Sequence, residues 1–484
     1  MGVIRKINTM LTDRKISCRE LTGMYLEVIE RDNPILNAYV NITRDEALSL
    51  ADSADRRLST GERVSPLLGV PMALKDNIST KGIETTCCSK ILKGYTPVYD
   101  ATVYTRLKEH GAVLLGKSNM DEFAMGNTCE TSCFGGAKNP WDISRVPGGS
   151  SGGSASAVAA SLAAFALGSD TGGSVRQPGS WCGLVGLKPT YGAVSRYGLI
   201  AYASSLDQIG TLTLDTEDAA IVFDAISAHD PLDSTSNRSY KANTLESLEN
   251  SVKGKTVGVI KECLKSLDDE VLSAVTNALK TFETLGAKVV YVDMPELETS
   301  LAAYYIIACA EASSNLGRYD GVRYGQKASL YDDVHDMMCK TRSQYFGSEV
   351  KRRILLGTYV LSEGFYNAYY KKATALRQNI SKAFEKAFVE CDVLFSPTTT
   401  HTASLYGSVC DDPTQSYYAD LCTVPANLAG LPSVSVPCGR DKNGLPIGIQ
   451  LTGNKFCEDI LLNFAHKFEQ EAGFECESKW GVKL

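Results

Sequence analysis

Two stretches, GGSSGGSA at residues 148–155 and DTGGSVRQPGS at residues 170–180, dominate the interpretation of this chain. Both are rich in glycine and serine, but apolar segments adjoin them, which argues against a flexible linker. Glycine destabilises regular helices and strands, so this density indicates places where the backbone turns sharply or approaches another group closely. Each serine cluster taken alone is equally typical of a glycine-rich turn.

A third segment, GVPMALKDN at residues 69–77, places Lys75 directly after an apolar stretch that we interpret as a buried strand. Burial is the environment in which a lysine loses its proton most easily. Taken alone, a lysine paired with the neighbouring Asp76 at a strand end is the simpler interpretation.

Together, the three segments resemble the amidase signature family in their sequences and in their spacing along the chain. The resemblance implies that Ser174 is the nucleophile and Lys75 the base. It also implies that Ser150 is the bridging serine, whose peptide bond is cis in the family. We therefore predict an amide-cleaving enzyme of the Ser–Ser–Lys type.

This assignment makes chemical sense. A serine hydroxyl is a poor nucleophile until a base takes its proton. A lysine can act as that base once burial has lowered its pKa, and a second serine can relay the proton to it. The backbone N–H groups of Thr171, Gly172 and Gly173, directly before Ser174, are predicted to form the oxyanion hole, because glycines let the backbone approach the substrate.

The resemblance covers nearly the whole chain and is strongest to one branch of the family, the A subunits of glutamyl-tRNA(Gln)/aspartyl-tRNA(Asn) amidotransferases. The segments that carry it are KSNMDEFAMG at 117–126, EASSNL at 311–316, GVRYG at 321–325, EVKRR at 349–353 and DLCTVPANLAGLP at 420–432. In that branch the subunit hydrolyses glutamine to glutamate and ammonia, and the ammonia passes to a partner that amidates a misacylated tRNA with ATP. The resemblance thus implies partner subunits B and C and contact with the misacylated tRNA mainly through a partner. It implies no cofactor on this chain, with ATP and Mg on a partner subunit.

The glutamine contacts of the branch fall on Arg353 and Asp420, and on Tyr304 or its neighbour Tyr305. Arg353 would otherwise be one member of a solvated basic run, and Tyr304 a core aromatic. The sequence departs from the expected pattern at residues 127–129, where Cys129 stands in place of a small or hydroxyl residue near the acyl pocket.

Two other enzyme signatures are present but stand in the wrong context. GAVLLGKS at residues 111–118 fits the P-loop pattern, but its middle residues are those of a strand interior. GSSGG at residues 149–153 fits the nucleophile elbow, and an Ala-rich helix over Ser154–Leu167 is plausible, but no hydrophobic strand precedes it. None of the downstream histidines, His229, His335, His401 and His466, lies in a suggestive setting. A stand-alone amidase acting on other small or aryl amides and a catalytically silent relative remain as alternatives.

Alternating strand and helix patterns predict an α/β fold with a large mixed β-sheet core flanked by helices on both faces. We expect a single domain over residues 1–484, with a helical N-terminal segment at 1–60, a catalytic core at 65–210 and the remaining sheet and substrate-binding helices at 250–484. Predicted strands include residues 67–74, 112–115, 255–260 and 287–292. Three further strands are expected at 392–396, 433–437 and 447–451, the last two flanking a hairpin turn at 441–444.

The formal net charge of −7 does not suggest a protein that binds nucleic acid through charge alone. The 15 cysteines are odd in number and the first residues lack a signal-peptide core, which predicts free thiols in the cytoplasm. No C-x-x-C pair suggests a metal site. No apolar stretch is long enough to span a membrane.

Overall fold

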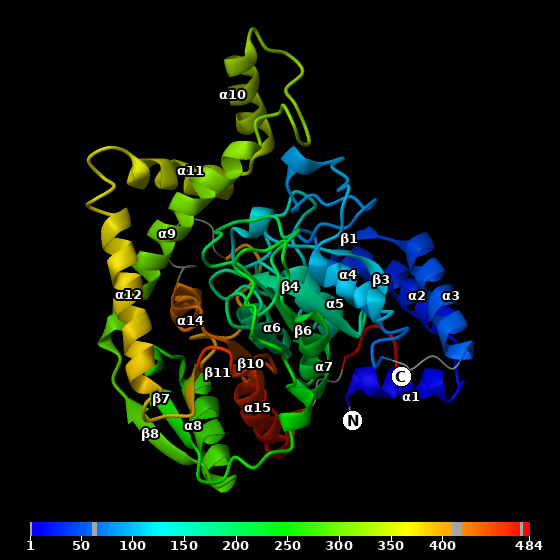
Figure 1. Ribbon diagram of the computed structural model, residues 1–484, viewed down its shortest axis with the longest axis vertical. Helices are drawn as coiled ribbons and strands as arrows, with labels where there is room; N and C mark the ends of the chain where they lie inside the picture. Colours follow the sequence, from blue (N-terminus) through cyan, green and yellow to red (C-terminus); the bar gives the residue numbers. More distant parts are fainter. Residues whose placement is uncertain (1, 61–64, 409–417, 475–477) are drawn as a thin grey trace.

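The structure is a computed structural model that describes residues 2–60, 65–408, 418–474 and 478–484. Its centre is an 11-stranded mixed sheet with the strand order β1-β3-β2-β4-β6-β5-β10-β11-β9-β7-β8 (Figure 1). The strands are β1 (Tyr39–Ile42), β2 (Pro71–Lys75), β3 (Val113–Ser118), β4 (Phe165–Asp170), β5 (Val185–Lys188), β6 (Gln208–Thr213), β7 (Thr256–Ile260), β8 (Lys288–Val292), β9 (Val393–Pro397), β10 (Ser433–Arg440) and β11 (Pro446–Thr452).

The central strands are covered on both faces. Every residue of β2, β4, β6 and β11 is buried. Because successive side chains of a strand point to opposite faces, this pattern requires packing on both sides of the sheet. The predicted α/β class with a mixed sheet is therefore confirmed.

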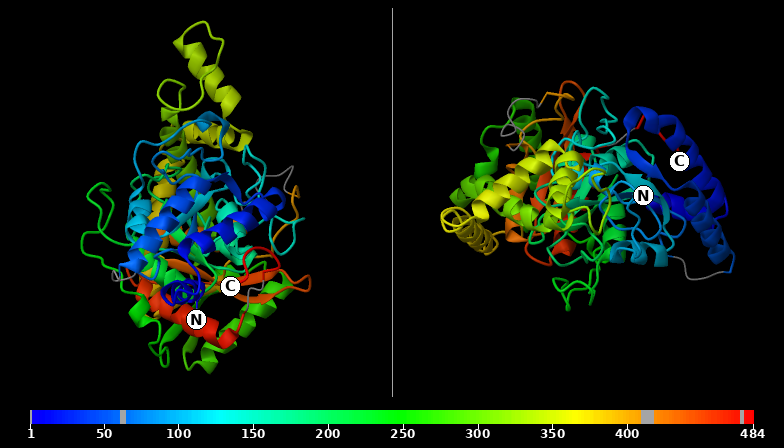
Figure 2. Two further views of the ribbon diagram at one scale, coloured as in Figure 1. Left: turned by 90° about the vertical axis from the view of Figure 1, so that its right-hand side faces the viewer. Right: turned by 90° about the horizontal axis from the view of Figure 1, so that it is seen from above.

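The helices cover this sheet and build the outer parts of the molecule (Figures 1 and 2). They are α1 (Val3–Thr12), α2 (Cys18–Leu36), α3 (Arg44–Ser59), α4 (Thr102–Glu109), α5 (Gly152–Ala159), α6 (Arg176–Cys182), α7 (Thr216–Ile226), α8 (Asp269–Thr284), α9 (Ser300–Asn315), α10 (Val334–Tyr345), α11 (Ser348–Leu361), α12 (Tyr370–Ala387), α14 (Val424–Ala429) and α15 (Glu458–Ala472). None of the described helices has the length and apolar character of a membrane span.

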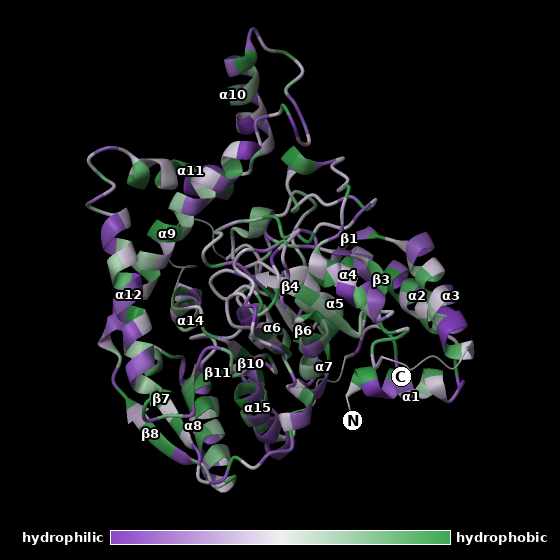
Figure 3. Ribbon diagram, in the orientation of Figure 1, coloured by the Kyte–Doolittle hydropathy of each residue, from purple (hydrophilic) through white to green (hydrophobic). Residues whose placement is uncertain are grey.

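Helices α9 to α12 form a layer at one side of the molecule, and α10 projects from it (Figures 1 and 2). In α12 the buried residues Ala373, Ile380, Phe384 and Ala387 follow helical spacing. Figure 3 accordingly shows hydrophobic and hydrophilic residues alternating along this helix. This layer matters for the site because α9 carries the candidate substrate contacts Tyr304 and Tyr305, and α11 carries Arg353.

The strand order brings two functional segments to one edge of the sheet. Lys75 is the last residue of β2, and Asp170 is the last residue of β4. The two strands are parallel neighbours, with Met72 opposite Phe165. Since the carboxyl ends of parallel neighbours meet at the same edge, Lys75 lies beside the loop that leads from β4 to Ser174.

Two parts of the predicted secondary structure are wrong. The N-terminal segment contains three helices, but residues 39–42 form the edge strand β1, which pairs with β3. The Ala-rich run Ser154–Leu167, which suggested a single helix, is divided between two elements: helix α5 ends at Ala159, and strand β4 begins at Phe165. Sheet pairing of β4 with both β2 and β6 overrides the helix propensity of alanine there.

Strands β5 and β6 are also missing from the predicted set. The strands that the sequence does predict are present in the structure, with shifted ends. The hairpin turn between β10 and β11 forms as expected: a side-chain oxygen of Asp441 accepts hydrogen bonds from the amides of Asn443 and Leu445 at 2.8 and 2.9 Å. Gly444 adopts a φ of 80°, which glycine tolerates without strain.

Candidate active site

Lys75 lies in a buried cluster of serines. Its Nζ atom is 2.7 Å from Oγ of Ser150 and 2.9 Å from Oγ of both Ser151 and Ser169. It also donates to the backbone carbonyl of Ser169 at 3.2 Å. The side chain is fully buried, and the partners within hydrogen-bond distance are uncharged. The predicted base therefore has the predicted bridging serine as its nearest partner.

The electrostatics favour a lysine that can lose its proton. Burial lowers the pKa of Lys75 from its ordinary value to about 8, although more distant carboxylates, Asp121 foremost, act in the opposite direction. With that pKa, roughly one molecule in ten carries a neutral Lys75 at pH 7. The base is thus available near neutral pH without a carboxylate partner.

Asp76 does not pair with Lys75. Its carboxylate lies 3.8 Å from Nζ of Lys117 and accepts a hydrogen bond from the amide of Thr86 at 3.0 Å. Lys117 in turn donates to the carbonyl of Ile78 at 2.6 Å. Two buried lysines thus stand side by side on β2 and β3, and only Lys117 has an acidic partner.

The two serine clusters pack against each other. The amide of Ser151 donates to the carbonyl of Ser174 at 3.1 Å, and the Gly149–Ser150 peptide bond is cis, as the resemblance implied. Ser150 is fully buried, whereas Ser174 is 7% exposed, so Ser174 is the serine that a substrate can reach. A Cβ atom at Gly149 would lie 2.2 Å from an oxygen of Asp121, which explains the glycine.

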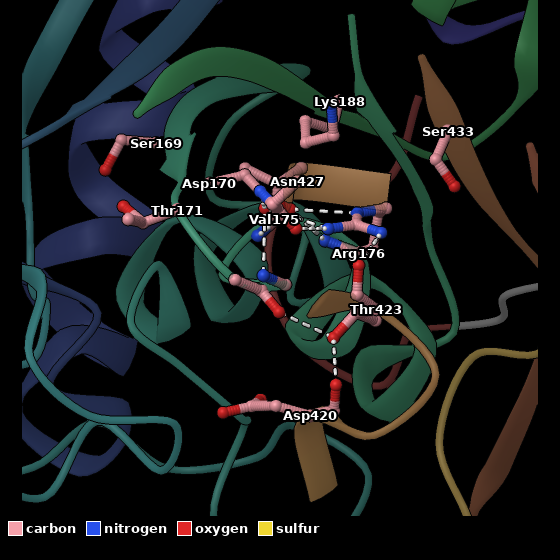
Figure 4. Close-up of polar contacts among 12 residues, drawn as sticks. Ser169, Asp170, Thr171, Val175, Arg176, Lys188, Asp420, Thr423, Asn427 and Ser433 are labelled. Atoms are coloured by element: carbon pink, nitrogen blue, oxygen red, sulfur yellow. Dashed lines mark hydrogen bonds and ion pairs between the residues drawn. The ribbon is translucent and has the colours of Figure 1, made fainter. Parts of the chain in front are cut away.

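A buried ion pair, which the sequence did not suggest, fixes the segment that carries Ser174 (Figure 4). Asp170 accepts hydrogen bonds from the amides of Gly173 and Val175 at 2.9 and 3.1 Å and from the Arg176 guanidinium at 3.0 Å. Burial acts to raise the pKa of Asp170, but Arg176 and the hydrogen bonds outweigh it and hold that pKa well below its usual range. Asn427 of α14 completes the cluster, donating to Asp170 at 2.8 Å.

The charged residues on either side of Ser174 were the available sequence signal for this cluster. In DTGGSVR an aspartate and an arginine lie six residues apart around a glycine pair. What the sequence could not supply is Asn427, which is distant along the chain and reaches the cluster only through the fold.

The predicted oxyanion loop is tightly enclosed. A Cβ atom at Gly172 would lie 2.6 Å from the ring of Tyr304, and one at Gly173 would lie 2.3 Å from Oγ1 of Thr423. The hydroxyl of Thr171 donates to Asp207 at 2.6 Å. The amide of Gly173 already donates to Asp170, so of the three predicted donors those of Thr171 and Gly172 are the better placed to bind an oxyanion.

The predicted carboxylate-binding residue, Arg353 of α11, is not part of a solvated run. Its side chain is buried, while Lys351 and Arg352 are exposed. Its Nη1 donates to the hydroxyl of Tyr202 at 2.6 Å, and its Nε donates to Glu349 at 2.8 Å.

Asp420 lies on the other side of the two tyrosines of α9. The hydroxyl of Tyr305 donates to its carboxylate at 3.3 Å, and the amide of Asn127 does so at 3.4 Å. The guanidinium of Arg353 lies over the ring of Tyr305, 5.4 Å from its centre. Burial raises the pKa of Asp420 to about 7, although the nearby Arg353 lowers it in part.

Both candidate tyrosines thus lie at the site, with different partners. Tyr304 packs on Gly172 of the oxyanion loop, and Tyr305 contacts Asp420 and Arg353. Thr423 joins the two regions, because its hydroxyl donates to the carbonyls of Gly172 at 2.6 Å and of Asp420 at 3.2 Å (Figure 4).

Cys129, the departure from the expected pattern, is buried behind the serine cluster. Its amide donates to Asp121 at 2.9 Å. A Cβ atom added at Gly152 would lie 2.5 Å from the Cβ atom of Cys129. Burial raises the pKa of its thiol to about 12, which keeps it protonated and a poor competitor for the nucleophile's role.

The structure supports neither the P-loop pattern nor the nucleophile elbow. Residues 113–118 of the P-loop pattern are the buried strand β3. The hydroxyl of Ser151 in the elbow pattern contacts Lys75 and donates to Ser169 at 3.1 Å; no hydrogen bond among the described residues joins it to a histidine. The described residues also contain no group of three or more His, Cys, Asp and Glu side chains that could hold a metal ion.

Comparisons with known proteins agree with this geometry. The model of the family described as Amidase matches residues 20–462. The chain is 53% identical over 475 residues to the A subunit of the glutamyl-tRNA(Gln) amidotransferase from Caldanaerobacter subterraneus subsp. tengcongensis, covering 98% of this chain and 97% of the relative.

Solved structures show the same fold. The A subunit of the glutamyl-tRNA(Gln) amidotransferase from Thermotoga maritima superposes with a TM-score of 0.78 at 42% identity, covering 94% of this chain and 95% of that one. The native peptide amidase of Stenotrophomonas maltophilia superposes with a TM-score of 0.84 at 30% identity, covering 97% and 96%. The fold is thus common to proteins with different amide substrates, and the residues around the serines must decide which substrate is used.

Proposed function

Since this chain belongs to the Amidase family, we propose that it is the glutamine-hydrolysing A subunit of an amidotransferase that converts Glu-tRNA(Gln), Asp-tRNA(Asn) or both to the amidated aminoacyl-tRNA. The observation that carries the proposal is the pair of opposite charges, Arg353 and Asp420, buried beside the loop that precedes Ser174. The names of its relatives support the same activity.

Free glutamine carries a carboxylate and an ammonium as well as the amide that is cleaved. Both charges are costly to bury unless they are paired. The planar guanidinium of Arg353 suits the carboxylate, because it can bind both oxygens at once. Asp420, held between Tyr305 and Asn127, suits the ammonium. A pocket for neutral amides would need neither charge.

In the first half of the reaction, neutral Lys75 takes a proton from Ser150 as Ser150 takes one from Ser174. The Ser174 oxygen then attacks the side-chain amide carbon, and the resulting oxyanion is bound by backbone N–H groups of the loop 171–173. Removing one such donor typically costs about 3–4 kcal/mol of barrier height.

In the second half the proton returns from Lys75 through Ser150 to the leaving nitrogen. The carbon–nitrogen bond breaks, which releases ammonia and leaves a γ-glutamyl ester on Ser174. Water then attacks this ester as Ser150 and Lys75 take its proton, the ester bond to Ser174 breaks, and the proton returns through Ser150 to the Ser174 oxygen, which yields glutamate and free Ser174. The relay needs Lys75 neutral before Ser174 attacks and again before water attacks, and the buried position of its Nζ atom, with serine oxygens as its hydrogen-bond partners, provides for this.

The proposal extends to the assembly. We expect subunits B and C as partners, a misacylated tRNA held mainly by a partner, and ATP with Mg on a partner subunit rather than on this chain. The expected location is the cytoplasm. Co-purification of the tagged chain from its native host, followed by mass spectrometry of bound proteins, tests this part.

The activity is tested with glutamine labelled with ¹⁵N at the side-chain amide. The complex should release labelled ammonia and glutamate in equal amounts, and Ser174→Ala should release none while melting at the same temperature as the parent protein. Rapid acid quenching should trap the γ-glutamyl adduct on the peptide that contains Ser174. An adduct on Ser151 or on a cysteine would contradict the triad, and hydrolysis of neutral amides without that of glutamine would favour a stand-alone amidase.

A further inference from the structure

We propose that Asp207 is a positioning residue that fixes the oxyanion loop, residues 171–173, relative to the guanidinium of Arg353; this inference rests on the proposed function. Asp207 follows the loop of residues 202–206 and directly precedes strand β6. It belongs to none of the three serine and lysine segments, yet its carboxylate connects the two ends of the site.

At one end, Asp207 holds the oxyanion loop. Its Oδ1 atom accepts a hydrogen bond of 2.6 Å from the hydroxyl of Thr171. Both side chains are almost completely buried, with 2% of Asp207 and 1% of Thr171 exposed. Thr171 directly follows the last residue of β4, so this bond sets the direction in which the chain leaves the sheet toward Gly172 and Ser174.

At the other end, Asp207 holds the residue that contacts Arg353. Its Oδ2 atom accepts hydrogen bonds from the amides of Tyr202 at 2.9 Å and Ala203 at 3.1 Å. The hydroxyl of Tyr202 then accepts the 2.6 Å bond from Nη1 of Arg353. The link from Arg353 to Thr171 therefore runs through Tyr202 and the carboxylate of Asp207.

Only a carboxylate meets the demands of this position. Three donors converge on Asp207: the Thr171 hydroxyl and two backbone amides. A carboxylate offers acceptor sites on both oxygens, whereas an asparagine offers one acceptor oxygen and directs an NH₂ donor at the other partners. Leaving a buried donor unpaired in this way is unfavourable, so Asp207→Asn should release one end of the link without changing side-chain size.

The link matters because glutamine has a fixed length between its carboxylate and its amide. With the carboxylate on Arg353, the amide oxygen reaches the oxyanion donors only if the loop stays at the matching distance. Misplacement by about 1 Å can cost roughly 100-fold in rate. The tyrosines of α9 add a packing contact between Arg353 and Gly172, whereas the hydrogen-bonded link to Thr171 runs through Asp207.

The test compares Asp207→Asn, Thr171→Val and the double variant in the complex, with glutamine and with a small neutral amide. Each single variant should lower kcat for glutamine by about 100-fold, and should lower it less for the neutral amide, which depends on the oxyanion donors but not on their distance from Arg353. The double variant should be no slower than either single one, because both changes break the same bond. Thr171→Ser, which keeps the hydroxyl, should lose less activity than Thr171→Val and serves as the matched control for the loss of the hydrogen bond.

Tyr202→Phe tests the other end. It removes the acceptor for Arg353 and should raise KM for glutamine, so that the ratio of kcat/KM for glutamine to that for the neutral amide falls. Thermal melting checks that each variant folds. Losses that multiply in the Thr171→Val, Asp207→Asn double variant, or an Asp207→Asn protein with the parent's kcat, would overturn the inference. If the parent complex does not hydrolyse glutamine, the proposed function fails, while the neutral amide still reports on the Thr171–Asp207 link.

Discussion

The amino group of Lys75 and the hydroxyl of Ser150 are joined by a 2.7 Å hydrogen bond, and both side chains are fully buried. A lysine in this position is poised between its two protonation states, because burial favours the neutral form while the surrounding hydroxyls can accept hydrogen bonds from the charged one. The protonation state of the site therefore depends on this pair, because the other hydrogen-bond partners of Lys75 are serine oxygens.

Replacement of Lys75 should separate charge from basicity. Arginine keeps a positive charge but does not lose its proton near neutral pH. We expect Lys75→Arg to be nearly as inactive as Lys75→Ala in steady-state amide hydrolysis, with both variants checked for folding by circular dichroism. Substantial activity in Lys75→Arg would show that a neutral base is not required.

The pH profile should report two groups. Lys75 acts as a base only when neutral, and its pKa of about 8 predicts that kcat/KM for a neutral amide rises with pH and levels off above about 8. For glutamine, Asp420 must also be ionised, and its pKa of about 7 predicts a steeper fall below pH 7. Coincident profiles for the two substrates would exclude a role for ionised Asp420 in binding glutamine.

Arg353→Ala and Asp420→Ala should weaken the use of glutamine selectively. Each leaves one substrate charge unpaired in a buried site, which typically costs about 2–5 kcal/mol. A small neutral amide should still be hydrolysed, since Lys75, Ser150 and Ser174 are unchanged. We would measure kcat/KM for both substrates in the parent and in each variant. A parallel loss for both would identify the residues as structural, and no loss would favour the stand-alone amidase.

Lys117 should matter for folding and not for ATP. It lies in strand β3 and binds Asp76 and the Ile78 carbonyl, so Lys117→Ala leaves a buried carboxylate unpaired and should lower the free energy of unfolding by about 3–5 kcal/mol. Calorimetry should detect no ATP binding to the chain alone. Micromolar ATP binding that disappears in Lys117→Ala would revive the P-loop.

Local sequence was sufficient where the signal lies within a few residues. The largely apolar segments 67–74 and 255–260 predicted strands, and the turn at 441–444 predicted its hairpin, because strand burial and turn geometry depend on adjacent residues. The family resemblance then supplied the serines and the lysine, whose spacing no physical argument from a single sequence could interpret.

Propensity alone failed where pairing partners are far away. The alanines before Phe165 favour a helix, but strand β4 forms there because it lies between β2 and β6 in the sheet. The short strand β1 likewise exists only through its pairing with β3. Sheet register is a long-range property, and the side-chain pattern of four to six residues is too short to specify it.

By itself, therefore, the sequence predicted through the family resemblance which residues carry the chemistry, and only the tertiary structure decided how each is held. The tertiary structure pairs Asp76 with Lys117 and surrounds Lys75 with serines. It also brings Asn427 to Asp170 and places Asp207 between Thr171 and Tyr202. The physical reason is that ion pairs and hydrogen bonds act over a few ångströms in space. Burial, which sets their strength and the pKa of Lys75, depends on every element packed around them.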